Sequence, residues 1–403
     1  MYNYRAQWFV YLLKILKTAQ TDIYDIPQVE AQAKTAQTKF GRLRKNAYFC
    51  GMKKLLLLIL VALAAVGRAD ACTSMIVSAR ASASGRPLLW KHRDTGADNN
   101  FLQRVQPTNG CYGYVGLFNA GDSLLREAWM GMNDAGFAIM NTASYNLAPD
   151  TTDYVDREAL VMTEALRHCA SVDEFEALLA AMPKPLGVQA NFGVIDAHGG
   201  AAYFETSDHT WTRFDANDEP SGVLIRTNYS FSGIEGEGNG YVRYQTAYRL
   251  SADAISTGQV TPMLLTETLS RSFYHSLLCQ DFLTNGAQFV VDADFIPRPI
   301  STASIVVEGV NNPNDASRLA MWAALGYPPC APVYHVTLTD IPAELRPTSQ
   351  WRSIACDDAA QLRRSALPAM GHNSVDYLNL EILRPIIERM HQRSMTTYRT
   401  HRH

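Results

Sequence analysis

Short runs in which hydrophobic and polar residues alternate recur from Cys72 onward, and this period of two predicts β-strands. The first two runs flank a Gly85-Arg86-Pro87 turn and end near Lys91, so they predict a β-hairpin. A second hairpin is predicted over Asn191–Thr206, where two alternating runs flank a pair of glycines. Further strands are predicted at Gly113–Phe118, Ala128–Met132, Phe137–Asn141, Gly222–Asn228, Thr302–Glu308 and Pro332–Leu338.

Helical spacing of apolar residues appears between these groups of strands. Val172–Ala181 is predicted as a helix that opens with a capping box, because Glu174 follows Ser171 by three residues. Other helices are predicted at Asp156–Cys169, Val242–Ala254, Pro262–Leu278 and Tyr377–Arg393, the last followed by a loose basic tail. Since strands and helices come in separate groups, the order predicts an α+β fold of two antiparallel sheets between helical layers, rather than a parallel doubly wound sheet.

The longest apolar run, Leu55–Val66, is twelve residues long and so falls short of the roughly 20 residues that a membrane-spanning helix needs. Two lysines after Met52 precede it and a small-residue Ala69-x-Ala71 pattern follows, which together predict a secretory signal peptide over 52–71. Residues 1–51 are then interpreted as an over-extended leader, with translation starting at Met52; an amphipathic leader is the alternative. The expected partner is signal peptidase, and the expected location is the periplasm or the cell exterior.

Cleavage after Ala71 would change the charge of the chain. It removes 11 of 36 basic and 4 of 39 acidic residues, leaving a net charge of about −10, which argues against a nucleic-acid partner. The remaining length fits one domain over 72–345 with a C-terminal helical extension and basic tail over 346–403. Nothing in this part is predicted to span a membrane, and a homo-oligomer is compatible with it.

No metal or organic cofactor is expected. The six cysteines from Cys72 onward contain no CxxC pair, HExxH is absent, and the ten histidines are scattered. The glycine-rich stretch Gly236–Gly240 lacks the strand-to-helix context of a phosphate-binding loop. Disulfide pairing among the cysteines stays open at this point.

Cleavage between Ala71 and Cys72 would place a thiol and a free α-amine on one residue. The amine has a pKa of about 7.7–8.0, so it can exchange a proton with the thiol. The predicted hairpin returns Lys91-His92-Arg93-Asp94 to the side of Cys72, where a cation would favour the thiolate and a carboxylate would hold the ammonium. The alternatives are a lipoprotein anchor at Cys72, a disulfide, and a merely solvated charged strand end.

Three further stretches carry a family resemblance together with Cys72-Thr73-Ser74 and Ala83–Asp94: WMGMNDAGFAIMNTASYN, FIPRPISTASIVVEGV and MWAALGYPPC. Over most of Cys72–Leu338 the chain resembles the N-terminal-nucleophile (Ntn) cysteine hydrolases. It is most similar to the group of acyl-coenzyme A:6-aminopenicillanic-acid acyltransferase and carcinine hydrolase, with choloylglycine hydrolases and penicillin V acylases as relatives. The resemblance implies an αββα four-layer sandwich. It also implies cleavage of linear amide C–N bonds, or acyl transfer, through a thioester on Cys72.

The resemblance also implies roles for individual residues. Cys72 matches the nucleophile and, through its amine, the general base and acid, while Asp94 matches the aspartate that orients this amine. Lys91 stands where the family often has arginine, so a point charge replaces a bidentate fork and Arg93 could serve instead. The oxyanion-binding asparagines are matched by Asn141 and Asn228. A downstream arginine of the site is matched, with a looser alignment, by Arg243.

The substrate stays open between several amides: conjugated bile acids, penicillin-type side chains, acylated amino acids and small dipeptides. Two aromatic stretches, Tyr112–Phe118 and the loop Tyr145–Tyr154, are predicted to form an apolar acyl pocket, with Tyr145 as a substrate-binding residue. The rival hypothesis from another class is a surface lipoprotein or binding module on an Ntn scaffold without catalysis.

Overall fold

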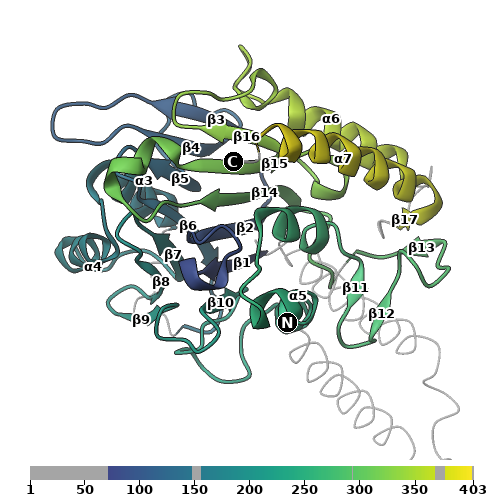
Figure 1. Cartoon of the computed structure of the whole chain (residues 1–403), viewed down its shortest axis with the longest axis horizontal. Coiled ribbons are helices and arrows are strands. Elements are labelled where there is room, and N and C mark those ends of the chain that lie inside the picture. Colours follow the sequence, from purple (N-terminus) through teal and green to yellow (C-terminus); the bar gives the residue numbers. More distant parts are fainter. Residues whose placement is uncertain (1–70, 148–155, 293, 368–376, 402–403) are drawn as a thin grey trace, which may run out of the picture. The chain divides into compact units, whose positions relative to one another are not determined.

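Two antiparallel sheets lie face to face in the computed structural model, which describes residues 71–147, 156–292, 294–367 and 377–401 (Figure 1). These residues belong to one compact unit, Asp70–His403. The predicted leader and signal peptide lie outside the described residues except for Ala71, as do residues 148–154 of the predicted aromatic loop.

Sheet 1 contains the strand that begins beside the predicted cleavage point. Its six strands run in the order β10-β1-β2-β14-β15-β16 and pair antiparallel throughout. Their bounds are β10 Val223–Arg226, β1 Ala71–Val77, β2 Leu88–Asp94, β14 Ser301–Glu308, β15 Ala320–Leu325 and β16 Tyr334–Thr337. The central position of β1 and β2 means that residues from both the second half and the end of the chain surround the predicted hairpin.

Sheet 2 is a seven-stranded meander in chain order. Its strands are β3 Asn100–Val105, β4 Tyr114–Asn119, β5 Met130–Asn133, β6 Ala138–Ala143, β7 Ala190–Ile195, β8 Ala201–Thr206 and β9 Trp211–Asp215. Two short pairs lie outside the sheets: β11 Tyr274–His275 with β12 Gln280–Asp281, and β13 Phe289–Val290 with β17 Leu378–Asn379.

Helices cover the outer face of each sheet, so apolar side chains form three layers. One buried cluster joins sheet 2 to α3 (Glu158–His168) and α4 (Val172–Ala181). A second fills the space between the sheets. A third joins sheet 1 to α5 (Tyr241–Ser256), α6 (Ile354–Ser365) and α7 (Leu380–Thr400). The predicted αββα four-layer sandwich is therefore confirmed.

Local sequence signals account for several elements. Alternation along β1 sends Met75 and Val77 into the helix-side cluster and Ile76 into the space between the sheets. The predicted capping box is confirmed, because Ser171 Oγ accepts a hydrogen bond from the Glu174 backbone N–H at 3.1 Å. Both predicted hairpins are also confirmed, as β1–β2 and β7–β8.

Two helix predictions are wrong in extent. The helix predicted over Pro262–Leu278 is limited to a π-helical turn, Leu264–Leu269, because the Ser270 hydroxyl bonds Leu265 O and Ser304 of β14 and the chain then enters β11. The basic tail predicted after Arg393 is helical to Thr400. Tyr398 anchors it by stacking on Trp322, with ring centroids 4.4 Å apart.

The longer elements β3, β9, β15 and α6 escaped prediction, as did the two-residue strands β11, β12, β13 and β17. The residues of β15 are buried on both faces of the sheet, so their apolar run has no alternation to read. β9 lies at the edge of sheet 2 and is partly exposed, with no buried residue along it.

Candidate active site

Cys72 is the second residue of β1, which lies between β10 and β2, and β2 carries Lys91 and Asp94. In the β1–β2 register Cys72 is opposite Arg93 and Ala71 is opposite Asp94. On the other side Ser74 is opposite Arg226, so the chain after β10 reaches Cys72 at Asn228. The Cys72 side chain is 6% exposed, and its backbone N–H donates to Asn228 Oδ1 at 3.0 Å.

Lys91 shares the face of sheet 1 on which the Cys72 thiol lies, because residues paired across antiparallel strands project to the same side. Its ammonium donates to Trp129 O at 2.8 Å and to Asn141 Oδ1 at 2.5 Å. Burial raises the pKa of the Cys72 thiol, whereas the Lys91 charge and, more weakly, Arg93 lower it. Lys91 is thus the strongest electrostatic support for a thiolate in the site.

Asp94 lies on the opposite face of β2, towards the helical layer. Ser301 Oγ donates to Asp94 Oδ1 at 2.5 Å, and Arg298 Nη1 lies 3.9 Å from Oδ2. The Cys72 Sγ is 3.9 Å from the Asp94 carbonyl oxygen. Burial, followed by the charges of Arg243 and Arg298, lowers the pKa of neighbouring His92 to about 3, so this ring is neutral at physiological pH.

The amide of Asn228 has one orientation. Its Oδ1 accepts hydrogen bonds from the Cys72 N–H and from Arg243 Nη2 at 2.6 Å, and its Nδ2 donates to Ala143 O at 2.9 Å. Because a guanidinium only donates, the oxygen must face Cys72 and Arg243. The Asn228 side chain is fully buried at this position.

Arg243, whose match in the sequence was the loosest, contacts Cys72 directly. Its Nη1 donates to the Cys72 carbonyl oxygen and, at 2.8 Å, to Thr73 Oγ1. Burial lowers the pKa of Arg243 to about 10, so the group keeps its charge at neutral pH. Gly240, at the N-cap of α5, has φ 92°, and a Cβ there would lie 2.5 Å from Arg243 Nη2. The glycine-rich stretch therefore makes room for this side chain.

Asn141 has partners other than those expected of an oxyanion donor. Its Oδ1 accepts from Lys91, and its Nδ2 donates to Oε2 of Glu158. Sequence reasoning missed Glu158, which is 3% exposed in the first turn of α3; a carboxylate on an otherwise apolar helix face was the available signal. Burial raises the pKa of Glu158 to about 8, Asp156 adds to this, and Lys91 opposes it.

The two predicted aromatic stretches have different environments. In the stretch Tyr112–Phe118, Tyr114 and Phe118 are core residues, fully buried in the cluster between sheet 2 and its helices. Tyr145 is 36% exposed, and its backbone N–H donates to Asn228 O at 3.2 Å, so it lies next to the site.

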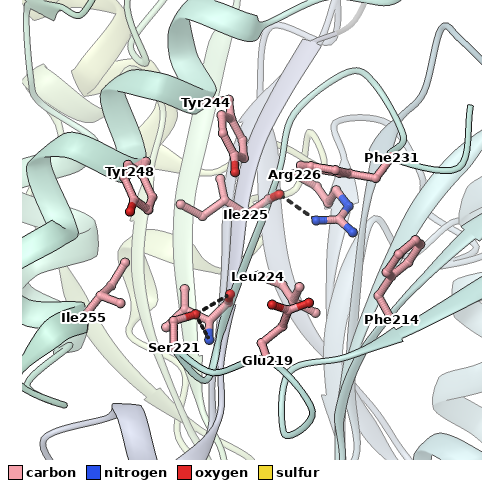
Figure 2. Close-up of a pocket in the computed structure, with 11 residues that line it drawn as sticks. Phe214, Glu219, Ser221, Leu224, Ile225, Arg226, Phe231, Tyr244, Tyr248 and Ile255 are labelled. Carbon is pink, nitrogen blue, oxygen red and sulfur yellow. Dashed lines mark hydrogen bonds between the residues drawn. The ribbon is translucent and has the colours of Figure 1, made fainter. Parts of the chain in front are cut away.

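A cavity of about 260 Å³ is lined by residues of β10, α5 and the neighbouring chain segments (Figure 2). Residues of β10 form its floor, α5 contributes Tyr244, Tyr248 and Ile255 to one wall, and Phe214 and Phe231 lie across from them. Arg226 is held there by Glu205, with Nε to Oε1 at 2.6 Å. Two of the lining residues are close in sequence to candidate residues: Tyr244 follows Arg243 on α5, and Arg226 precedes Asn228 by two positions.

Within the described residues, all six cysteines are free thiols and no group of three or more His, Cys, Asp or Glu side chains could hold a metal ion. None of the helices in the described ranges is long and apolar enough to cross a membrane.

A scan of protein-family models and a search of curated proteins found no match for this chain. Among solved structures, the chain is similar to a conjugated bile acid hydrolase from Clostridium perfringens, with a TM-score of 0.42 and 11% identity over 67% of this chain and 94% of that chain. It is also similar to an N-acylethanolamine-hydrolyzing acid amidase ortholog from Caenorhabditis elegans, with a TM-score of 0.37 and 13% identity over 62% of this chain and 99% of that chain. The match to penicillin V acylase from Agrobacterium tumefaciens has a TM-score of 0.37 and 12% identity, over 67% of this chain and 87% of that chain. Penicillin V acylases, which the sequence resemblance named, thus occur among these matches.

Proposed function

We propose that this chain is the precursor of an exported Ntn cysteine hydrolase that cleaves linear amide C–N bonds through a thioester on Cys72. One observation carries the proposal: the backbone nitrogen of Cys72, and not only its thiol, lies in a polar site. Asn228 Oδ1 accepts its hydrogen bond, and Arg243 fixes that oxygen. Cleavage after Ala71 would convert this nitrogen into an amine at a position that already holds it.

The amine would act as the base that the thiol needs. It takes the thiol proton, and Lys91 stabilises the resulting thiolate on the face between the sheets. Asp94, opposite Ala71 in the register, would lie beside the new ammonium once Ala71 has left. The positive charge of Lys91 would stabilise the thiolate of Cys72, and the negative charge of Asp94 would stabilise its ammonium group.

The chemical steps follow from these groups. The Cys72 sulfur attacks the amide carbonyl carbon, and negative charge develops on the carbonyl oxygen. The second Nδ2 hydrogen of Asn228 is the donor that we assign to this oxyanion, a contribution of about 2.7–4 kcal/mol. The α-ammonium then protonates the departing amine as the C–N bond breaks, which leaves a thioester. Water, deprotonated by the amine, releases the acyl group; an amine acceptor would make the reaction an acyl transfer.

The cavity between α5 and β10 is assigned to the apolar part of the substrate. Its aromatic walls suit an acyl or aryl group. Arg243 is on α5, and Asn228 follows β10 by two residues. Export to the periplasm or the cell exterior, with signal peptidase as the processing enzyme, forms part of the same proposal.

The test begins with the mature N-terminus. Intact mass of the exported protein is expected to correspond to a chain that starts at unmodified Cys72. This protein and its Cys72→Ala variant are then screened against bile-acid, penicillin-type, N-acyl amino acid and dipeptide amides, and the acyl-enzyme is trapped and located by mass spectrometry. Cys279→Ser, which changes an exposed thiol outside the site, is the control. A diacylglycerol adduct on Cys72 would instead support the surface lipoprotein hypothesis and contradict the proposed enzyme.

A further inference from the structure

A continuous series of buried polar contacts leads from α3 to the nucleophile. Glu158 accepts a hydrogen bond from Asn141 Nδ2, and Asn141 Oδ1 in turn accepts one from the Lys91 ammonium. Glu158 and Lys91 are 3% and 2% exposed. These residues come from α3, β6 and β2, so the fold brings together groups that the sequence keeps far apart.

The side-chain amide of Asn141, the middle residue of this series, can take two orientations, and only one of them offers the Lys91 ammonium an acceptor. An asparagine amide presents an oxygen on one side and an NH2 group on the other. If the amide turned over, its NH2 group would face the Lys91 ammonium and its oxygen would face the Glu158 carboxylate. Two donors and two acceptors would then oppose each other in a buried space, which is costly. Above the Glu158 pKa of about 8 the group is an ionised carboxylate that only accepts hydrogen bonds, so it selects the orientation that gives Lys91 its acceptor.

Two oxygen atoms accept hydrogen bonds from the Lys91 ammonium. The carbonyl of Trp129 and the Asn141 oxygen accept its hydrogen bonds, and the Cys72 thiol lies on the same face of sheet 1. A lysine side chain is flexible, and it lacks the rigid fork that would hold an arginine in place. Its position relative to the thiol thus depends on how well Asn141 is held.

We propose that Glu158 is a positioning residue for the nucleophile: through Asn141 it holds the Lys91 ammonium where it stabilises the Cys72 thiolate. This inference rests on the proposed function of Cys72 and adds to it a residue with no sequence match to the family's site. Glu158 does not touch the thiol or the reacting atoms, so its effect must pass through Asn141.

The direction in which the pKa of the Cys72 thiol changes when Glu158 is removed distinguishes a positioning role of Glu158 from a simple effect of its charge. The charged groups around the thiol are Lys91, Arg93, Asp94 and Arg243, and those that act on Glu158 are Lys91 and Asp156. Removing the carboxylate only as a negative charge would favour the thiolate, so the thiol would titrate at lower pH. Losing the correct placement of Lys91 would have the opposite effect.

The experiment measures the rate of alkylation of Cys72 against pH in the mature protein. Iodoacetamide is the probe, and mass spectrometry resolves the Cys72 peptide from the other thiols. Glu158→Ala is expected to raise the pH midpoint of Cys72 alkylation by about one unit, the size of shift that a displaced neighbouring charge produces. Asn141→Ala is expected to raise it similarly, and it tests the proposal even if the Glu158 variant fails to fold.

The double variant decides whether the effect passes through Asn141. Because residues that act in series are not additive, Glu158→Ala is expected to add no further shift once Asn141 is alanine. Glu267→Ala is the matched control: it removes a buried carboxylate paired with Arg271 at 2.8 Å in the helical layer over sheet 1, and it should leave the midpoint unchanged.

An unchanged or lowered midpoint in Glu158→Ala, or additive shifts in the double variant, would overturn the positioning role. Alkylation requires no substrate, so this result is independent of whether an amide is cleaved. A chain that hydrolyses no amide but shows the expected shifts would contradict the proposed function and support the positioning role of Glu158. An active amidase whose alkylation midpoint does not change in the Glu158 variant would support the proposed function and overturn the positioning role.

Discussion

Cys72 and Cys169 are both buried thiols, and their surroundings differ in one decisive respect. Burial raises the pKa of Cys169 to about 12, and the nearby Glu174 adds to the rise. Burial also raises the pKa of Cys72, but Lys91 and Arg93 lie on the same face of the sheet and oppose it. The difference teaches that burial alone makes a thiol inert, and that a cation placed between the sheets is what makes one thiol a candidate nucleophile.

The largest expected difference is between two variants in which one of these cysteines, Cys72 or Cys169, is replaced by alanine. Cys72→Ala should lower kcat/KM on any amide substrate by about 10⁴-fold or more, because the bond-forming atom is lost. Cys169→Ala should leave kcat/KM within about twofold and lower the free energy of unfolding by about 1–3 kcal/mol, since it touches only packing. Steady-state kinetics and urea unfolding measure the two quantities. Comparable losses of activity in both variants would contradict the contrast drawn between these regions.

Asn228→Ala is expected to have the next largest effect. Loss of one oxyanion donor should lower kcat by about 10²–10³-fold, with little change in KM, because the interaction strengthens only as charge develops. The control is Asn133→Ala, beside Cys169, which should affect stability because Asn133 Nδ2 donates to the Leu166 and Cys169 carbonyl oxygens. If Asn228→Ala changed KM alone, the asparagine would bind the ground state rather than the oxyanion.

Lys91→Met tests the cation that distinguishes Cys72 from Cys169. The Lys91 charge lowers the pKa of the thiol, so removing it should raise that pKa, and the pH–rate curve should move to higher pH by about one unit. Arg93→Met is the matched control on the same strand. Its guanidinium donates to Asn119 Oδ1 at 2.7 Å, and its effect on the thiol is the weaker one. A larger shift in the Arg93 variant would assign the supporting charge to Arg93.

The smallest expected effect concerns the cavity between α5 and β10. Tyr244→Ala removes one aromatic wall and should raise KM about 2- to 10-fold with kcat nearly unchanged. Tyr112→Ala is the control, because Tyr112 precedes β4 and is not among the residues that line this cavity. Equal KM values for the Tyr244 variant and the parent protein would remove the cavity from the substrate site.

Local pattern was sufficient for the elements that bring Lys91 and Asp94 to Cys72. The β1–β2 hairpin spans little more than twenty residues, and its turn and alternation set the register. The same signals were enough for the β7–β8 hairpin and for the capped helix α4. They failed for β15, which lacks alternation because both of its faces are buried, and for the stretch after Leu269, where contact with β14 ends the helical turn.

What the sequence determined by itself was a thiol at the start of a strand, with a cation and a carboxylate returned beside it, because both follow from nearest-neighbour chain geometry. The family resemblance pointed to Asn228 and Arg243, but only the tertiary structure decided their partners. Asn228 lies 156 positions from Cys72 and reaches it through the β1–β10 register. The tertiary structure also gave the Asn141 side chain two partners, Lys91 and Glu158, that the sequence did not predict. No local pattern encodes such contacts. A polar side chain buried between packed layers must find its hydrogen-bond partner in the protein, and the packing of distant elements decides which partner is within reach.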